Sequence, residues 1–101
     1  MPRCRLDERV ADVAVRLLTG WDICVVVSDD GVVLGLLGRS ALRASEDVRV
    51  ETAMTPGPRT IRPSARLHAI ADRMRDENVT LLLVTHSDGV LVGVVRREDI
   101  A

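Results

Sequence analysis

Four short apolar runs, arranged as two pairs, dominate the hydrophobic pattern of the chain. They cover residues 23–27, 32–37, 81–84 and 90–95. Within each pair a four-residue polar segment ending in Asp-Gly joins the two runs: residues 28–31 and 86–89. Asp-Gly between β-branched runs predicts a tight hairpin, because glycine accepts the positive φ of the turn. The runs are almost continuously apolar, which predicts strands buried on both faces.

A helix is predicted before each hairpin, after a short extended segment. Apolar residues recur there at helical spacing, at Val10, Val13, Ala14 and Leu17 and again at Leu67, Ile70, Ala71 and Met74. Asp7 and Ser64 precede these stretches and are predicted N-caps, because their side-chain oxygens can accept a free amide of the first turn. A second helix is predicted at residues 39–44, whereas its counterpart in the second half would be cut off after one turn at Ala101.

The two halves are copies of one unit. Residues 31–42 (GVVLGLLGRSAL) align with residues 89–100 (GVLVGVVRREDI), 58 positions apart, with four identities and five aliphatic exchanges in twelve positions. The first helices align at an offset of 57. The sequence therefore predicts an α/β (α+β) fold of two tandem β-α-β-β-α repeats with pseudo-two-fold symmetry. We assign residues 1–50 to the first repeat, 51–101 to the second, and 46–58 to the connection.

A family resemblance covers essentially the whole chain and is strongest in residues 54–74 and 81–100. The stretches MTPGPRTIRPSARLHAIADRM and LLLVTHSDGVLVGVVRREDI resemble a CBS-domain pair, also called a Bateman module. The resemblance implies a sensor of an adenosine compound such as AMP, ADP, ATP or S-adenosylmethionine. It also implies a homodimer that regulates an attached or partner effector protein.

The family's ligand motif is Gly-aliphatic-aliphatic-Thr/Ser-x-x-Asp at the start of the second helix. Residues 93–99 match it through Asp99, whose position implies a ribose contact, while Arg96 replaces the hydroxyl residue and could pair with a phosphate. Arg97 follows at the predicted helix start. Residues 35–41 lack both the hydroxyl and the carboxylate, so we expect the first repeat to be empty or to bind only through its backbone and Arg39.

Four further positions of the second repeat match those that face the adenine in the family: Thr60, Ile61, Thr80 and Leu81. The family's usual proline in the middle strand is replaced by Leu82 and Val25. The plainer interpretations stay open. Asp99 could be a first-turn acid that complements the helix dipole, and Arg96 and Arg97 a solvated pair. Trp21 could be a packing residue or could line a pocket of the first repeat.

The first helix has a second apolar stripe. Ala11, Val15 and Leu18 follow the spacing i, i+4, i+7. This stripe predicts either a wide buried face or the helix-lined dimer contact that the resemblance implies. Apolar helix faces are rarely left exposed, which favours the dimer.

Composition narrows the classes of function. Aromatic residues make up 1% of 101 residues and the net charge is −1, so neither base stacking nor an electrostatic footprint supports nucleic-acid binding. No apolar run approaches a membrane span and no signal-peptide pattern follows Met1, so we expect a cytoplasmic protein with no membrane contact. Cys4 and Cys24 could form a disulfide or remain two buried thiols.

No catalytic or metal-binding constellation stands out. His68 and His86 have no cysteine or acid at ligand spacing and are expected at the surface, and the serines have no neighbouring base. We therefore expect a non-catalytic regulatory module that senses an adenosine-containing ligand through the second repeat, without a metal. The alternative is a ligand-free dimerisation or protein-interaction module, within a larger protein or alone.

Overall fold

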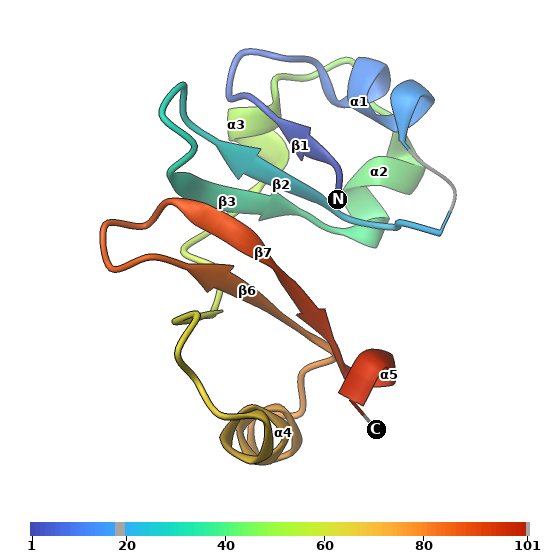
Figure 1. Ribbon diagram of the computed structural model, residues 1–101. Coiled ribbons are helices and arrows are strands. Elements are labelled where there is room, and N and C mark those ends of the chain that lie inside the picture. The colour runs from blue at the N-terminus through green and yellow to red at the C-terminus, as the bar shows by residue number, and fades with distance from the viewer. Residues whose placement is uncertain (18–19, 101) are drawn as a thin grey trace. The chain divides into compact units, whose positions relative to one another are not determined.

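The computed structural model describes residues 1–17 and 20–100, which divide into two compact units, Met1–Pro58 and Arg59–Ala101 (Figure 1). The first unit contains β1 (Arg3–Cys4), α1 (Val10–Arg16), β2 (Cys24–Val27), β3 (Val33–Leu37), α2 (Arg39–Ala44), α3 (Val50–Ala53) and β4 (Thr55–Pro56). The second contains β5 (Thr60–Ile61), α4 (Leu67–Asp76), β6 (Leu81–Thr85), β7 (Leu91–Arg96) and α5 (Arg97–Ile100). The predicted α+β fold of two β-α-β-β-α repeats is confirmed. The predicted connection, residues 46–58, includes α3 and β4.

Each unit is built on a small mixed sheet. In the first, the strand order is β1-β2-β3-β4, with β1 parallel to β2 and the other pairs antiparallel. In the second, the order is β5-β6-β7, with β5 parallel to β6 and β6 antiparallel to β7. All four residues of β2 are buried, which agrees with its unbroken apolar run.

Both predicted hairpins form, and they match in detail. Gly31 and Gly89 have φ of 83° and 89°, so each turn uses the left-handed conformation that glycine permits. The ladders are irregular at equivalent places, between Val26 and Val27 in one unit and Val84 and Thr85 in the other. The repeat therefore extends to the backbone geometry of the turn.

The predicted N-caps are wrong. The helices begin two residues later, with Arg9 and Arg66 as cap residues. A backbone turn intervenes in each unit, closed by a hydrogen bond from the amide of Glu8 to Arg5 and from the amide of Ala65 to Arg62. In α1, backbone carbonyls replace the side-chain cap: the amide of Val10 donates to Val48 at 2.9 Å and that of Ala11 to Glu46 at 3.2 Å.

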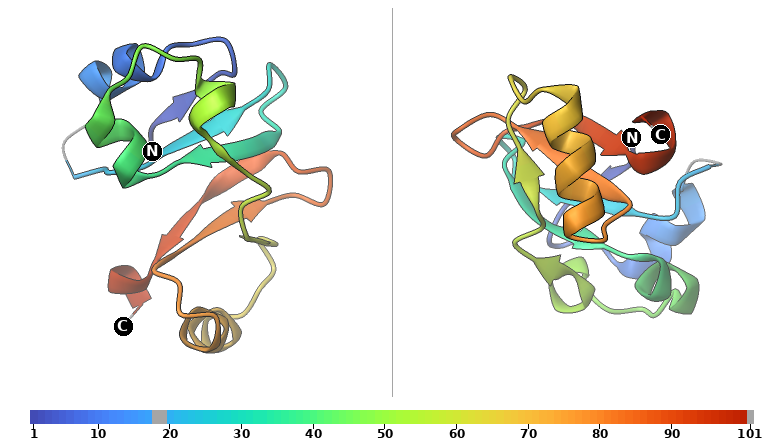
Figure 2. Two further views of the ribbon diagram at one scale, coloured as in Figure 1. Left: turned by 180° about the vertical axis from the view of Figure 1, so that it is seen from behind. Right: turned by 90° about the horizontal axis from the view of Figure 1, so that it is seen from below.

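Each unit has its own core beneath its first helix. In the first unit, Val10 and Val13 of α1 pack with Cys4, Val26 and Leu37 of the sheet. In the second, α4 lies against one face of the sheet (Figure 2), and the buried residues there are Ile61, Ile70, Met74 and Leu82. One face of each sheet is therefore covered by the first helix of its unit, and side chains on the other face do not contact that helix.

Candidate functional site

Five of the seven predicted ligand residues of the second repeat lie at one end of the β6–β7 hairpin, beside α5, whereas Thr60 and Ile61 pair with Leu83 and Val84 further along β6. Leu81 and Arg96 are direct partners in the antiparallel ladder. The amide of Arg97 donates to the carbonyl of Thr80 at 2.8 Å, which ties the first turn of α5 to the start of β6. Asp99 lies within that turn. Five positions from two segments of the sequence therefore share one corner of the sheet.

Strand alternation sorts the same residues by face. Leu82 packs in the core beneath α4, so its neighbour Leu81 lies on the opposite face. Arg96 pairs with Leu81, and Thr60 pairs with Leu83, which places Arg96 and Thr60 on that opposite face as well. A threonine, an aliphatic wall and a guanidinium thus share the face of the sheet away from α4.

Ile61 differs from the other predicted site residues. Its side chain is buried in the core on the α4 side, so any contact with a ligand would come from its backbone. The carbonyl of Thr60 is already engaged, because it accepts a hydrogen bond of 2.9 Å from Nη1 of Arg73.

Arg96 and Asp99 contact each other. Nε of Arg96 lies 3.5 Å from Oδ2 of Asp99, and Nη1 lies 3.4 Å from Oε1 of Glu98. The Arg96 side chain is 34% exposed and that of Asp99 is 53% exposed, so both remain within reach of solvent. A phosphate on Arg96 or a ribose on Asp99 would exchange with this ion pair, and an exposed pair costs little to open.

The equivalent corner of the first repeat is occupied differently. Arg39, at the start of α2, is tied to Asp22 through a hydrogen bond of 2.8 Å from Nε to Oδ2. This hydrogen bond holds the pKa of Asp22 below its usual range. Trp21 is partly exposed and lines a shallow cavity of about 180 Å³ with Leu17 and Leu42. Trp21 is thus a partly buried residue that also lines a cavity, which is compatible with both roles considered for it.

The helix of each unit carries an arginine that holds the edge strand. Nη2 of Arg16 donates to the carbonyl of Arg3 at 3.0 Å, as Arg73 does to Thr60 in the second unit. Glu8 fixes Arg16: Nη2 lies 3.0 Å from Oε2 of Glu8, which also accepts the amide of Arg5 at 2.7 Å. The sequence did not predict the hydrogen bond from a helix arginine to the edge strand, although Arg16 and Arg73 align at the offset of 57 that relates the first helices.

Glu8 makes stability depend on pH. The hydrogen bond from Arg16 holds the pKa of Glu8 below its ordinary 4.5. The resulting stabilisation is present above that value and is lost as the pH falls through the lower pKa of the folded state. Glu8→Gln should lower stability at neutral pH by up to about 1 kcal/mol and weaken its fall with acid, as measured by urea unfolding at several pH values. Glu46→Gln, at an exposed position, should leave the profile intact; an equal change in both variants would contradict the role of Glu8.

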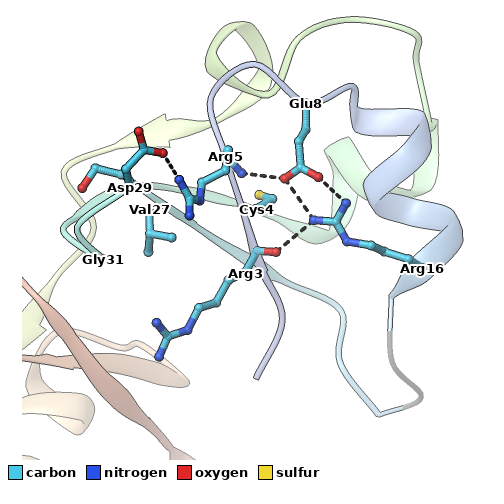
Figure 3. A pocket seen from close by; sticks show the side chains of 9 residues that line it. Arg3, Cys4, Arg5, Glu8, Arg16, Val27, Asp29 and Gly31 are labelled. Carbon is cyan, nitrogen blue, oxygen red and sulfur yellow. Dashed lines mark hydrogen bonds and ion pairs between the residues drawn. The ribbon is translucent and has the colours of Figure 1, made fainter.

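A second cavity, of about 410 Å³, lies beside β1 in the first unit (Figure 3). Arg3 of β1 and Arg5, which follows that strand, line it together with Arg16 of α1 and the β2–β3 turn. Sequence analysis named none of these arginines as site residues. The only sequence signal is the alternation of arginine at positions 3 and 5, on either side of Cys4.

Cys4 and Cys24 are free and buried, on adjacent parallel strands. The hydrogen bond with Cys24 and burial raise the pKa of the Cys4 thiol. His68 and His86 are exposed. Within residues 1–17 and 20–100, no three His, Cys, Asp or Glu side chains are grouped to hold a metal ion. In the same ranges, no helix is long and apolar enough to cross a membrane.

The α1 stripe is only partly described. Val15 is 88% exposed and Ala11 is partly buried, whereas Leu18 lies outside the described residues. Val15 is therefore an exposed apolar side chain on the helix that the sequence assigned to a dimer contact.

Residues 44–101 match the family model of the CBS domain, and the chain belongs to this family. No curated relative matches the sequence. Among solved structures, the cytosolic domain of the Mg²⁺ channel MgtE in complex with ATP is 25% identical with a TM-score of 0.88, covering 98% of this chain and 43% of its own. CBSX2 in complex with AMP is 21% identical, with a TM-score of 0.82 and 99% and 84% coverage.

A further similar structure comprises the CBS domains of a transcriptional regulator from Streptococcus pneumoniae, 20% identical with a TM-score of 0.83 and 98% and 84% coverage. The fold is thus that of a CBS-domain pair. The chain spans less than half of the MgtE domain and of the soluble part of a magnesium transporter, at 43% and 42% of their lengths.

Proposed function

We propose that this chain is a non-catalytic regulatory module that senses an adenosine-containing ligand through its second repeat. The observation that carries the proposal is the grouping of Thr60, Leu81 and Arg96 on one face of the sheet beside Asp99. The complexes of similar CBS proteins with ATP and AMP support adenine nucleotides as the ligand class. S-adenosylmethionine shares the adenosine moiety and belongs to the same class.

Each group of the site has a chemical task. Leu81 supplies an apolar wall for the adenine beside Thr60, and Thr80 and Ile61 contribute backbone groups. The Asp99 carboxylate accepts hydrogen bonds from ribose hydroxyls. Arg96 pairs with a phosphate, with Arg97 adding positive charge at the first turn of α5. Binding then exchanges the Arg96–Asp99 ion pair for contacts with the ligand.

Regulation requires that the ligand prefer one conformation. A ligand that bridges β6 and α5 shifts the protein only as far as its affinity differs between conformations. The recipient of the signal would be an attached or partner effector protein in the cytoplasm. Two proteins of similar fold support this proposal: one is the cytosolic domain of a Mg²⁺ channel, and the other comprises the CBS domains of a transcriptional regulator.

Asp99→Asn should weaken AMP or ATP binding about tenfold, because it removes a charged hydrogen-bond acceptor. Glu98→Gln is the matched control: it removes the same charge from the adjacent residue, which also contacts Arg96. Isothermal titration calorimetry measures both. Equal weakening by the two variants would show a general charge effect and contradict a ribose contact at Asp99.

One observation favours a second candidate, a ligand-free dimerisation module. Val15 is an exposed apolar side chain on α1. A homodimer through this helix would cover it, as the dimers of the family lead us to expect. Light scattering that gives a dimer for the native chain and a monomer for Val15→Glu, with no ligand binding by either, would favour this candidate over the sensor.

A further inference from the structure

Three arginines and two carboxylates, those of Glu8 and Asp29, line the cavity beside β1. Arg3 lies in β1 and Arg5 directly follows it, while Cys4 between them is buried in the core. Both arginines line the cavity. Arg16 closes the edge of β1, and the β2–β3 turn contributes Ser28. A volume of about 410 Å³ falls in the range of small-molecule sites, roughly 300–1,000 Å³.

The three guanidinium groups differ in their hydrogen-bond and ion-pair partners (Figure 3). Arg16 is fixed by two oxygens of Glu8 and by the carbonyl of Arg3, so it belongs to the frame. Arg5 pairs with Asp29, whose side chain is 96% exposed. Among residues 1–17 and 20–100, no side chain pairs with the guanidinium of Arg3.

The second repeat explains why Arg5 faces the cavity. Its counterpart Arg62 donates to the buried hydroxyl of Thr85 at 2.7 Å. In the first repeat the position of Thr85 is taken by Val27, which has no side-chain oxygen. Arg5 therefore pairs with the exposed Asp29 instead, and a threonine, Thr60, stands where the first repeat has Arg3.

We propose that this cavity binds the phosphate group of a small phosphorylated compound, between Arg3 and Arg5. A phosphate dianion presents enough oxygens for two guanidinium groups, each of which matches it in a bidentate manner. It displaces the Asp29 carboxylate from Arg5, and that exposed ion pair is weak. This phosphate site shares no residue with the adenosine site of the second repeat. The proposal of a phosphate site therefore does not depend on the adenosine site.

The test is an NMR titration of the full chain with inorganic phosphate and with glycerol phosphate at constant ionic strength. Backbone amides of residues 3–5 and 28–31 should shift saturably. Arg3→Gln or Arg5→Gln should raise the dissociation constant about tenfold. Asp29→Asn should lower the dissociation constant, because it removes the competing carboxylate. The tighter of the two probes distinguishes a free phosphate from a phosphate ester.

Arg43→Gln is the matched control, since it removes one positive charge from α2 in the same unit, outside this cavity. It should leave the dissociation constant unchanged. Shifts that grow linearly without saturation would overturn the proposal. So would equal weakening by Arg43→Gln and Arg5→Gln, or weaker binding by Asp29→Asn.

Discussion

Replacing Leu82 with alanine is expected to destabilise the protein by about 2–5 kcal/mol, the cost of removing a large side chain from a packed core. Leu82 is fully buried and packs with Ile61, Ile70 and Met74 beneath α4. The loss is a large share of the roughly 5–15 kcal/mol that holds a typical domain folded. Urea unfolding followed by circular dichroism measures it.

Leu81→Ala makes the matched comparison, because the two leucines are adjacent in β6 and face opposite sides of the sheet. Leu81 is only partly buried, so its truncation should cost about 1 kcal/mol or less. It should instead weaken binding of AMP or ATP. Equal destabilisation by the two variants would contradict the assignment of faces on which the candidate site depends.

Gly35→Ala is expected to destabilise the first unit by about 1–3 kcal/mol, the usual cost of overpacking. A Cβ at position 35 would lie 2.6 Å from Sδ of Met54 and 2.9 Å from the carbonyl oxygen of Thr55. The methionine can move, but the carbonyl belongs to β4, whose ladder pairs Gly35 with Pro56. The single tryptophan, Trp21, lies in this unit, so its fluorescence reports the transition.

Gly93 is the equivalent residue of the second repeat and provides the control. Apart from its two chain neighbours, no described residue has a heavy atom within 4 Å of the position of a Cβ at Gly93. Gly93→Ala should leave stability unchanged or raise it by up to about 1 kcal/mol, through the reduced freedom of the unfolded chain. Loss of stability in Gly93→Ala comparable to that in Gly35→Ala would show that the close approach of Met54 and Thr55 is not the cause.

Local sequence signals accounted for most of the fold. Asp-Gly turns, apolar runs and helical spacing are determined by neighbouring residues, and the hairpins at Gly31 and Gly89 formed as predicted. The internal repeat added the element order. The convergence of Leu81, Arg96 and Asp99 followed from the motif, because an antiparallel hairpin brings the start of one strand to the end of the next.

Features that depend on distant segments could not be predicted in this way. Asp7 is a residue type suited to an N-cap, but the amides of Val10 and Ala11 in α1 donate hydrogen bonds to backbone carbonyls of residues 46–48 instead. The cavity beside β1 depends on three segments, and on the loss of a hydroxyl at position 27 relative to position 85. Such a combination gives no periodic or local pattern.

The two repeats keep one scaffold and differ in their polar residues. The second holds Arg96 and Asp99 at the start of α5, where the first has Gly38 and Ala41. The first has Arg3 in its edge strand and Arg5 directly after it, where the second has Thr60 and an Arg62 that donates to Thr85.

An NMR titration of the full chain with AMP, ADP, ATP and S-adenosylmethionine tests the central claim most directly. At least one should give saturable shifts at Thr80, Leu81 and residues 96–99, and these should be weakened in Asp99→Asn. The absence of saturable shifts with all four, or shifts confined to residues 3–5 and 28–31, would contradict an adenosine site in the second repeat.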